Sequence, residues 1–362
     1  MVPGVASSQK SATYVFFVAK VAPLLSGYRF TPGTGLSSKS SYTANSTQIG
    51  TTYIRGGDAH PNGSSIAYAG DDSPYLFAVS LTSTTSGAPT IGTRFSAPST
   101  APQGSGTNNS AAATFSPDGT RLIYKSENTP FVEMYAWSSS GFGSRFSNPA
   151  TLPPGAVARA RWSGDSQYIG VASSVGTNYI TAYATSVSSG WGSKLADPST
   201  KPTGACSDIQ WSPSGSDVMA VSDATPFVFA YAWNGASSFG TKYSNPATIP
   251  SIAADNGSWS PSGRTVMVAS AGTVADFTYP FTSGTGFGTR KTAATNYPTG
   301  SPNTPTGVSI NHRGDAVSMS FSNTNIPVYV GNFTDANGVG TSITVPTGYA
   351  TNYTLDTFWV YV

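Results

Sequence analysis

The chain repeats a short pattern of turn residues about every 50 positions, and this internal repeat limits its fold more than any other feature. A polar four-residue turn starts at residues 60, 116, 163, 212, 260 and 312, reading HPNG, SPDG, SGDS, SPSG, SPSG and HRGD. A second pattern, a glycine followed two residues later by a base in most copies, starts at residues 27, 92, 143, 192, 240, 288 and 340. Six copies of one pattern and seven of the other indicate seven units. The units at the two chain ends are incomplete and together make up one of the seven.

Each unit contains four short runs of β-type residues. In one complete unit the runs span 158–163, 167–174, 179–186 and 193–198, with the two-residue period of strands. Polar turns typical of hairpins join the first two runs, and Asx-Pro corners such as SENTP and SDATP join the next two. Such units are typical of β-propeller blades. We therefore predict an all-β, seven-bladed β-propeller of four-stranded antiparallel blades; the alternative is a β-solenoid, which has shorter coils.

Both chain ends are expected to close the ring. We predict one propeller domain over residues 1–362, with its seventh blade shared between about 1–35 and 347–362. The run 11–20 aligns with third strands and leads into a fourth, so the N-terminus is expected to supply the outer half of this blade. The C-terminal run 349–362 is expected to supply the inner half. This closure would leave no unpaired sheet edge.

Tryptophans recur at fixed positions of the unit. Trp162, Trp211 and Trp259 stand at the end of the first strand, and Trp137 and Trp233 share a position on the third. Aromatic residues repeated at fixed blade positions predict packing between neighbouring blades.

The charge content argues against several classes of partner. Asp, Glu, Lys and Arg make up 9% of the residues, and the net charge is +2 without a run of bases. Nucleic acid and anionic lipid are therefore not expected as partners. No apolar run approaches the roughly 20 residues of a membrane-spanning helix. The N-terminal sequence lacks the pattern of a secretory signal, so synthesis and retention in a cytosol are expected.

Few residues could carry acid–base or metal chemistry. His60 and His312 fall at one turn position in different units, where a propeller would hold them apart. Glu127 and Glu133 flank a single turn, for which a turn-forming role is expected. Cys206 is the single cysteine, so it can form neither an intramolecular disulfide nor a cysteine metal cluster. We expect no catalytic residue, no metal and no cofactor.

Two acids and a set of bases are the remaining candidates. Asp208 and Asp255, near the starts of first strands, are expected to point toward the central channel as buried or ligand-contacting acids. A basic belt is expected on the outermost strands, either protecting the sheet edges or docking an acidic partner; its members are Arg29, Arg94, Arg145, Lys194, Lys242 and Arg290.

The motifs resemble a known group of repeats. The SPDG or SPSG hairpin, the TPF that opens the third strand and the exit FGSRFSNPATLP resemble WD40-like propeller repeats of bacteria, and more closely those of virion and tail-associated proteins of tailed bacteriophages. The Gly-His and Trp-Asp pairs of the WD signature are missing. The resemblance implies a virion component made in the host cytoplasm, with other virion proteins and host-surface glycans or receptors as partners.

We therefore expect a non-enzymatic structural or interaction protein of a tailed-phage particle, associated with tail or capsid. Its loops would make weak contacts that many copies strengthen. Alternatives are a glycan-binding adhesin or receptor-binding protein and, with least support, a propeller-fold hydrolase such as a glycan hydrolase or lactonase acting through Asp208 and Asp255. Function is expected where the repeats differ, in 33–52, 96–111 and 292–307.

Overall fold

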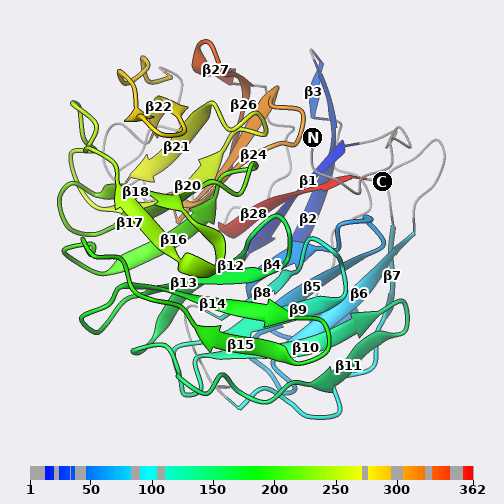
Figure 1. Ribbon diagram of the computed structural model, residues 1–362. Helices are drawn as coiled ribbons and strands as arrows, with labels where there is room; N and C mark the ends of the chain where they lie inside the picture. Colours follow the sequence, from blue (N-terminus) through cyan, green and yellow to red (C-terminus); the bar gives the residue numbers. More distant parts are fainter. Residues whose placement is uncertain are drawn as a thin grey trace.

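Seven four-stranded antiparallel sheets are arranged in a ring (Figure 1). The computed structural model describes residues 13–19, 24–32, 34–36, 46–82, 90–103, 111–270, 276–294, 305–322, 328–342 and 354–361. The innermost strand of each blade contacts the innermost strands of both neighbouring blades, so seven inner strands surround a central axis. The prediction of a seven-bladed β-propeller is confirmed.

Six blades are built from consecutive strands, with the first strand innermost. Blades 1 to 3 contain β4 (Ile54–Ala59), β5 (Ser65–Gly70), β6 (Leu76–Thr82) and β7 (Thr90–Arg94); β8 (Ala112–Phe115), β9 (Arg121–Lys125), β10 (Val132–Ser138) and β11 (Gly141–Arg145); and β12 (Val157–Trp162), β13 (Tyr168–Ser173), β14 (Ile180–Ser186) and β15 (Gly190–Lys194). Blades 4 to 6 contain β16 (Cys206–Trp211), β17 (Asp217–Ser222), β18 (Val228–Trp233) and β19 (Phe239–Lys242); β20 (Ala254–Trp259), β21 (Thr265–Ser270), β22 (Asp276–Thr282) and β23 (Gly286–Phe287); and β24 (Pro305–Ile310), β25 (Ala316–Phe321), β26 (Val328–Thr334) and β27 (Gly338–Ser342).

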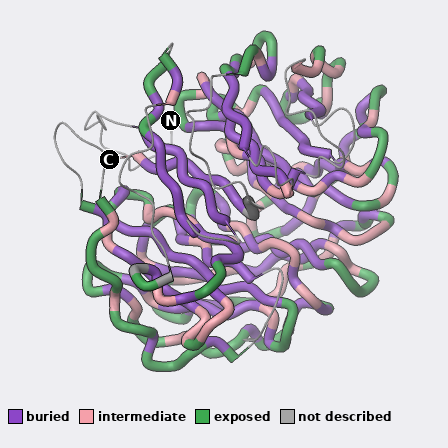
Figure 2. The backbone as a smooth tube through the Cα atoms, turned by 180° about the vertical axis from the view of Figure 1, so that it is seen from behind, coloured by how far each residue is buried: buried purple, intermediate pink, exposed green. Residues whose placement is uncertain are grey.

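Helical structure in the described chain is limited to α1 (Ser46–Ile49) and the short 3-10 turn η1 (Gly235–Ser237). Neither is long and apolar enough to cross a membrane. The hydrophobic core therefore lies between the sheets, and the buried residues follow the strands while exposed ones follow the connecting loops (Figure 2).

The closing blade combines strands from both ends of the chain, in the order β28 (Thr354–Tyr361), β1 (Thr13–Ala19), β2 (Leu25–Thr31) and β3 (Gly35–Leu36). β28 is innermost and pairs antiparallel with β1. The N-terminus thus supplies three strands instead of two, and β1 is a second strand instead of the expected third. Its sequence TYVFFVA is buried at every position, as are the second strands β5 and β17, because second strands are covered on both faces.

One hydrogen bond recurs in the hairpin turns of blades 2 to 6. The side chain of the first turn residue accepts the backbone N–H five residues later, at 3.0 Å for Ser116, 3.1 Å for Ser212 and 3.2 Å for Asn311. The backbone N–H of Asn311 donates to the carbonyl five residues later, as that of His60 does. Asn311, and not His312, therefore stands at the position of His60, so the placement of both histidines at one repeat position was wrong by a residue. The first turn carries His and the last carries Asn where the turns of blades 2 to 5 carry Ser, which hid this register.

Indole rings connect neighbouring blades, as the repeated tryptophans predicted. The indole N–H donates to an inner-strand carbonyl of the preceding blade, at 3.3 Å from Trp162 to Thr114 and 3.3 Å from Trp259 to Gln210. Trp359 on β28 makes the same contact to its preceding blade. The prediction that these residues pack between blades is confirmed.

Candidate active site

A cavity of about 280 Å³ lies among the inner strands at the centre of the ring. Residues from β4, β12, β16, β20, β24 and β28 line it, and these strands surround the axis in Figure 1. The polar lining includes Asp58, Arg161, Gln210, Ser258 and Asp356. Charged residues are scarce in this chain, so their grouping around this cavity makes the central channel the candidate functional site.

Arg159 and Arg161 enter the channel from β12. They are two residues apart, so both side chains lie on one face of the strand. Arg159 Nη1 lies 3.3 Å from Asp356 Oδ2, and its Nη2 donates to the Thr306 carbonyl at 3.3 Å. β12 is separated from the closing blade by two blades on one side and three on the other. Arg159 therefore bridges the channel from one side of the ring to the other.

Asp208 holds the second arginine from the neighbouring blade. Arg161 Nε donates to Asp208 Oδ1 at 3.4 Å. Asp208 is fully buried, and it also accepts hydrogen bonds from the Ile209 and Gly257 backbone and from the Gln210 amide. Its oxygens are thus occupied by the protein, and the geometry makes it a positioning residue for Arg161.

Asp58 contributes a carboxyl that two backbone N–H groups hold at the edge of the cavity. It accepts the Ala59 N–H at 2.9 Å and the Phe115 N–H, from the next blade, at 3.0 Å. The side chain keeps some contact with the channel, but protein atoms enclose it. This desolvation raises the pKa of Asp58 to about 6; the Arg161 charge and the backbone bonds offset it only in part.

Asp356 completes the set, and two glycines make room for it. A Cβ built on Gly56 would lie 3.3 Å from Asp356 Oδ2, and one on Gly307 would lie 3.2 Å from Oδ1. Both are tighter than ordinary van der Waals contacts. The negative charge of Asp356 is one of the influences that raise the pKa of Asp58. The two carboxyls and Arg161 therefore form one electrostatic unit.

One end of the cavity reaches the hairpin turn of blade 6. His312 is exposed there, its backbone N–H donates to the Tyr361 hydroxyl at 2.7 Å, and the two rings are in contact. His60 lies in another turn, where its Nε2 is 3.0 Å from the Gly119 carbonyl. Of the two histidines, only His312 borders the cavity.

The second predicted acid, Asp255, lies apart from this group. It lies on β20 between Ala254 and Asn256, where the pairing with β21 shifts register, and it does not line the cavity. Its Oδ2 is buried without a hydrogen-bond partner, and desolvation raises the pKa of Asp255 to about 6. The structure therefore does not bring Asp208 and Asp255 to one point.

The predicted basic belt divides into three kinds of placement. Arg94, Arg145, Lys194 and Lys242 end the outermost strands of blades 1 to 4. Arg29 lies on β2, which is a third strand, and Arg290 follows β23. The uniform outer-strand placement was therefore wrong for these two, because the closing blade begins one strand earlier than expected and β23 is only two residues long.

Glu133 is a partner within the belt. Its Oε2 lies 2.5 Å from Arg145 Nη1, and its Oε1 accepts the Gln103 N–H at 2.7 Å. Glu133 is buried within β10, so the expected turn-forming role was wrong for this residue. A carboxylate this deeply buried is retained because it is paired.

Sequence reasoning missed Asp58, Arg159, Arg161 and Asp356. The signal was present as charges at two inner-strand positions that most other units fill with uncharged residues. Function was also expected in the segments 33–52, 96–111 and 292–307. Parts of these segments, residues 33, 37–45, 104–110 and 295–304, lie outside the described residues. Among the residues that the structure describes, no three His, Cys, Asp or Glu side chains are grouped to hold a metal ion.

The solved structures that match the chain in shape include 6-phosphogluconolactonase-like propellers. A proposed 6-phosphogluconolactonase from Bacteroides uniformis matches with a TM-score of 0.70 and 12% identity, over 96% of this chain and 99% of its own. One from Bacteroides fragilis matches with a TM-score of 0.68 and 11% identity over 98% and 99%. A periplasmic gluconolactonase from Pseudomonas aeruginosa matches with a TM-score of 0.68 and 13% identity over 97% and 99%.

No protein-family model and no curated protein sequence matches the chain. At these identities the structural likeness establishes the shared fold. The comparisons give no support to a WD40-like or phage relationship. The expectation of a non-enzymatic virion or host-contact protein, with its adhesin alternative, was wrong: the propellers that match nearly end to end carry the names of lactonases.

Proposed function

We propose that this propeller is a hydrolase that opens a lactone, the cyclic ester of a hydroxy acid, in its central channel. The observation that carries the proposal is the Asp58 carboxyl, with its pKa raised to about 6, electrostatically coupled to Arg161 in a polar cavity. A carboxyl of this kind is mostly ionised at neutral pH yet basic enough to accept a proton, as a general base requires.

In the proposed reaction Asp58 removes a proton from water, and the hydroxide adds to the lactone carbonyl carbon. The carbonyl oxygen becomes an oxyanion, which the Arg161 guanidinium stabilises with its N–H donors. When the ring C–O bond breaks, the departing alkoxide takes the proton back from Asp58. The product is the open hydroxy acid, and Asp58 returns to its ionised form.

The surrounding residues support these two roles. Asp208 binds Arg161 through Nε, which leaves the terminal nitrogens of the guanidinium for the substrate. Gln210 and Ser258 also line the cavity. Gln210 Nε2 donates to Asp208 at 2.9 Å, which leaves its Oε1 to accept a hydrogen bond from a substrate hydroxyl, and the Ser258 hydroxyl accepts the Ile310 N–H at 3.1 Å. Charged donors fixed before the reaction are effective because they need not reorganise during it.

The size of the cavity and the fold agree with such a substrate. About 280 Å³ is near the lower end of the range for ligand pockets and suits a compact ring. The structural likeness to propellers named as lactonases supports the reaction class, and those names supply the substrates to try first.

The test is a pH-stat assay of acid release from glucono-δ-lactone and its 6-phosphate, corrected for spontaneous hydrolysis. We expect the protein to accelerate opening of at least one lactone. Asp58→Asn should lower kcat by about 10²–10⁴-fold. Arg161→Gln should lower it by about 10²–10³-fold.

The matched control is Asp255→Asn, which alters an acid of similarly raised pKa outside the cavity and should retain full activity. Absence of catalysis with both lactones, or equal turnover by Asp58→Asn and the unaltered protein, would overturn the proposal.

A further inference from the structure

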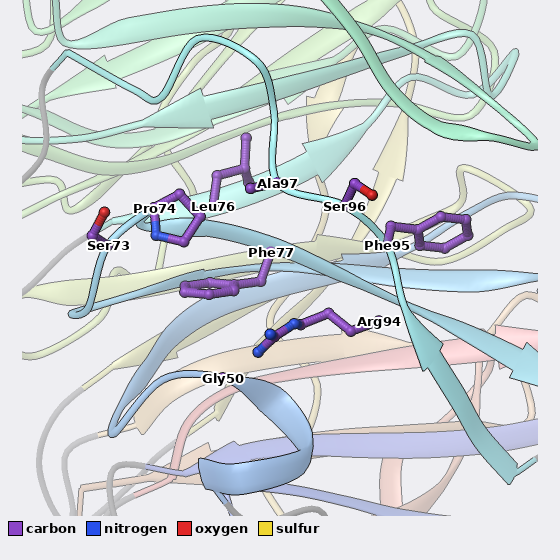
Figure 3. A pocket seen from close by; sticks show the side chains of 9 residues that line it. All are labelled: Gly50, Ser73, Pro74, Leu76, Phe77, Arg94, Phe95, Ser96 and Ala97. Carbon is purple, nitrogen blue, oxygen red and sulfur yellow. The ribbon is translucent and has the colours of Figure 1, made fainter.

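A second pocket lies on the rim of blade 1, where its lining includes the outermost strand β7, and Figure 3 shows its lining residues. Its volume is about 290 Å³, and its lining comes from β6, β7, the residues that follow β7, the corner before β6 and the segment before β4. The one charged group in its lining is the guanidinium of Arg94. None of its lining residues lines the channel cavity.

Arg94 occupies the same repeat position as three other bases of the belt. It pairs with Val79 in the sheet register, as Arg145, Lys194 and Lys242 pair with the equivalent residues of blades 2 to 4. Each of the three equivalents has an internal acceptor. Arg145 binds Glu133 at 2.5 Å, Lys194 binds Asp197 at 2.5 Å, and Lys242 binds Asn245 at 2.6 Å.

Blade 1 carries apolar residues at both of these acceptor positions. Phe77 precedes Val79, the register partner of Arg94, by two residues, and it therefore corresponds to Glu133 of blade 2. Counting three residues on from the base, Ala97 stands where Asp197 and Asn245 stand. Both Phe77 and Ala97 line the pocket. Within the described residues no hydrogen bond or ion pair occupies the Arg94 guanidinium.

The guanidinium is nevertheless seated against the protein. It lies between the Gly50 backbone and the Phe77 ring in Figure 3. A Cβ built on Gly50, whose φ is +84°, would come within 1.7 Å of Arg94 Nη1. A side chain at residue 50 would therefore displace the guanidinium. Phe77 is buried and forms an apolar wall beside it.

We propose that this rim pocket binds a small organic carboxylate. The planar fork of an arginine matches a carboxylate with two parallel charge-assisted hydrogen bonds, and the ring face of Phe77 suits the apolar part of such an anion. The carboxylate would supply the acceptor that Glu133 or Asp197 supplies in other blades. This inference does not depend on the proposed lactone hydrolysis.

The experiment is isothermal titration calorimetry with benzoate as the probe, at fixed low ionic strength. We expect a saturable binding event that Arg94→Gln weakens about tenfold or more. Ala97→Asp should weaken it similarly, because it recreates the internal pair of Lys194 and Asp197 at an exposed position. Thermal melting would verify that both variants fold.

Two controls separate this site from other bases. Lys242→Gln alters the equivalent position of blade 4 and should leave the binding event unchanged. Asp58→Asn, which alters the channel, should also retain it, so the two proposals fail independently. The proposal is overturned if no binding event depends on Arg94, or if inorganic phosphate occupies the site while benzoate does not.

Discussion

Replacing Asp58 by asparagine should change how the stability of the protein depends on pH. Desolvation raises the pKa of this carboxyl from 3.8 to about 6 in the folded chain. Between these two values the folded state binds more protons than the unfolded state. The contribution of Asp58 to the free energy of unfolding is therefore greatest below pH 4, falls as pH rises, and levels off above pH 6.

The size of this effect follows from the shift. A rise of about two units in the pKa corresponds to roughly 3 kcal/mol, and the partial exposure of the Asp58 side chain makes this an upper bound. An asparagine side chain does not titrate, so the Asp58→Asn variant should gain up to about 3 kcal/mol relative to the unaltered protein between pH 4 and pH 7. The amide can serve only one of the two N–H donors of Ala59 and Phe115, which adds a constant cost of about 1–3 kcal/mol at every pH.

The assay is urea unfolding of both proteins at pH values from 4 to 7.5, with the difference in unfolding free energy plotted against pH. The constant cost shifts this curve vertically and leaves its slope unchanged. A flat difference curve would refute the claim that the Asp58 pKa is raised. A curve of the opposite slope would mean that the charge of Arg161 outweighs desolvation.

Three further predictions concern the channel and its frame. Asp208→Asn should lower kcat about tenfold or more with little change in KM, because Arg161 loses its anionic partner; steady-state kinetics with the lactone substrate checks this. Gly307→Ala should cost about 1–3 kcal/mol of stability, since its Cβ would lie 2.9 Å from Ser320 Oγ and 3.2 Å from Asp356 Oδ1, and a lower thermal midpoint would show it. Trp259→Ala should cost about 3–5 kcal/mol in urea unfolding, because a cavity opens between two blades; a loss below 1 kcal/mol would contradict that packing role.

The architecture could be predicted from the sequence because the pattern of one blade repeats along the chain. Repeated turns and strands fix the blade, and seven copies leave little freedom in the ring. The closing blade was assigned less well. Burial along β1 on both faces distinguishes a second strand from a third, and this depends on the neighbouring blades instead of on the local sequence.

The site could not be read in the same way. Asp58, Arg161 and Asp356 lie in blades 1, 3 and the closing blade, far apart in the chain, and only ring closure brings them together. Asp208 was singled out as a buried acid, but its position on the strand does not reveal that four donors occupy it. The raised pKa of Asp58 likewise comes from enclosure by several blades.

Resemblance of repeats also proved a poor guide to activity. Turns such as SPDG are determined by the hairpin they form, so unrelated propellers can share them. The residues of the candidate site stand at positions where the units differ from one another. A comparison of inner-strand positions, unit by unit, would have found the charged ones.

A crystal structure with gluconate, the product of glucono-δ-lactone opening, tests the central claim most directly. We predict that its carboxylate binds the Arg161 guanidinium inside the channel, with an oxygen of the same group within hydrogen-bond reach of Asp58. Gluconate density confined to other surfaces, with the channel free of it at saturating concentration, would contradict the assignment of the channel as the active site.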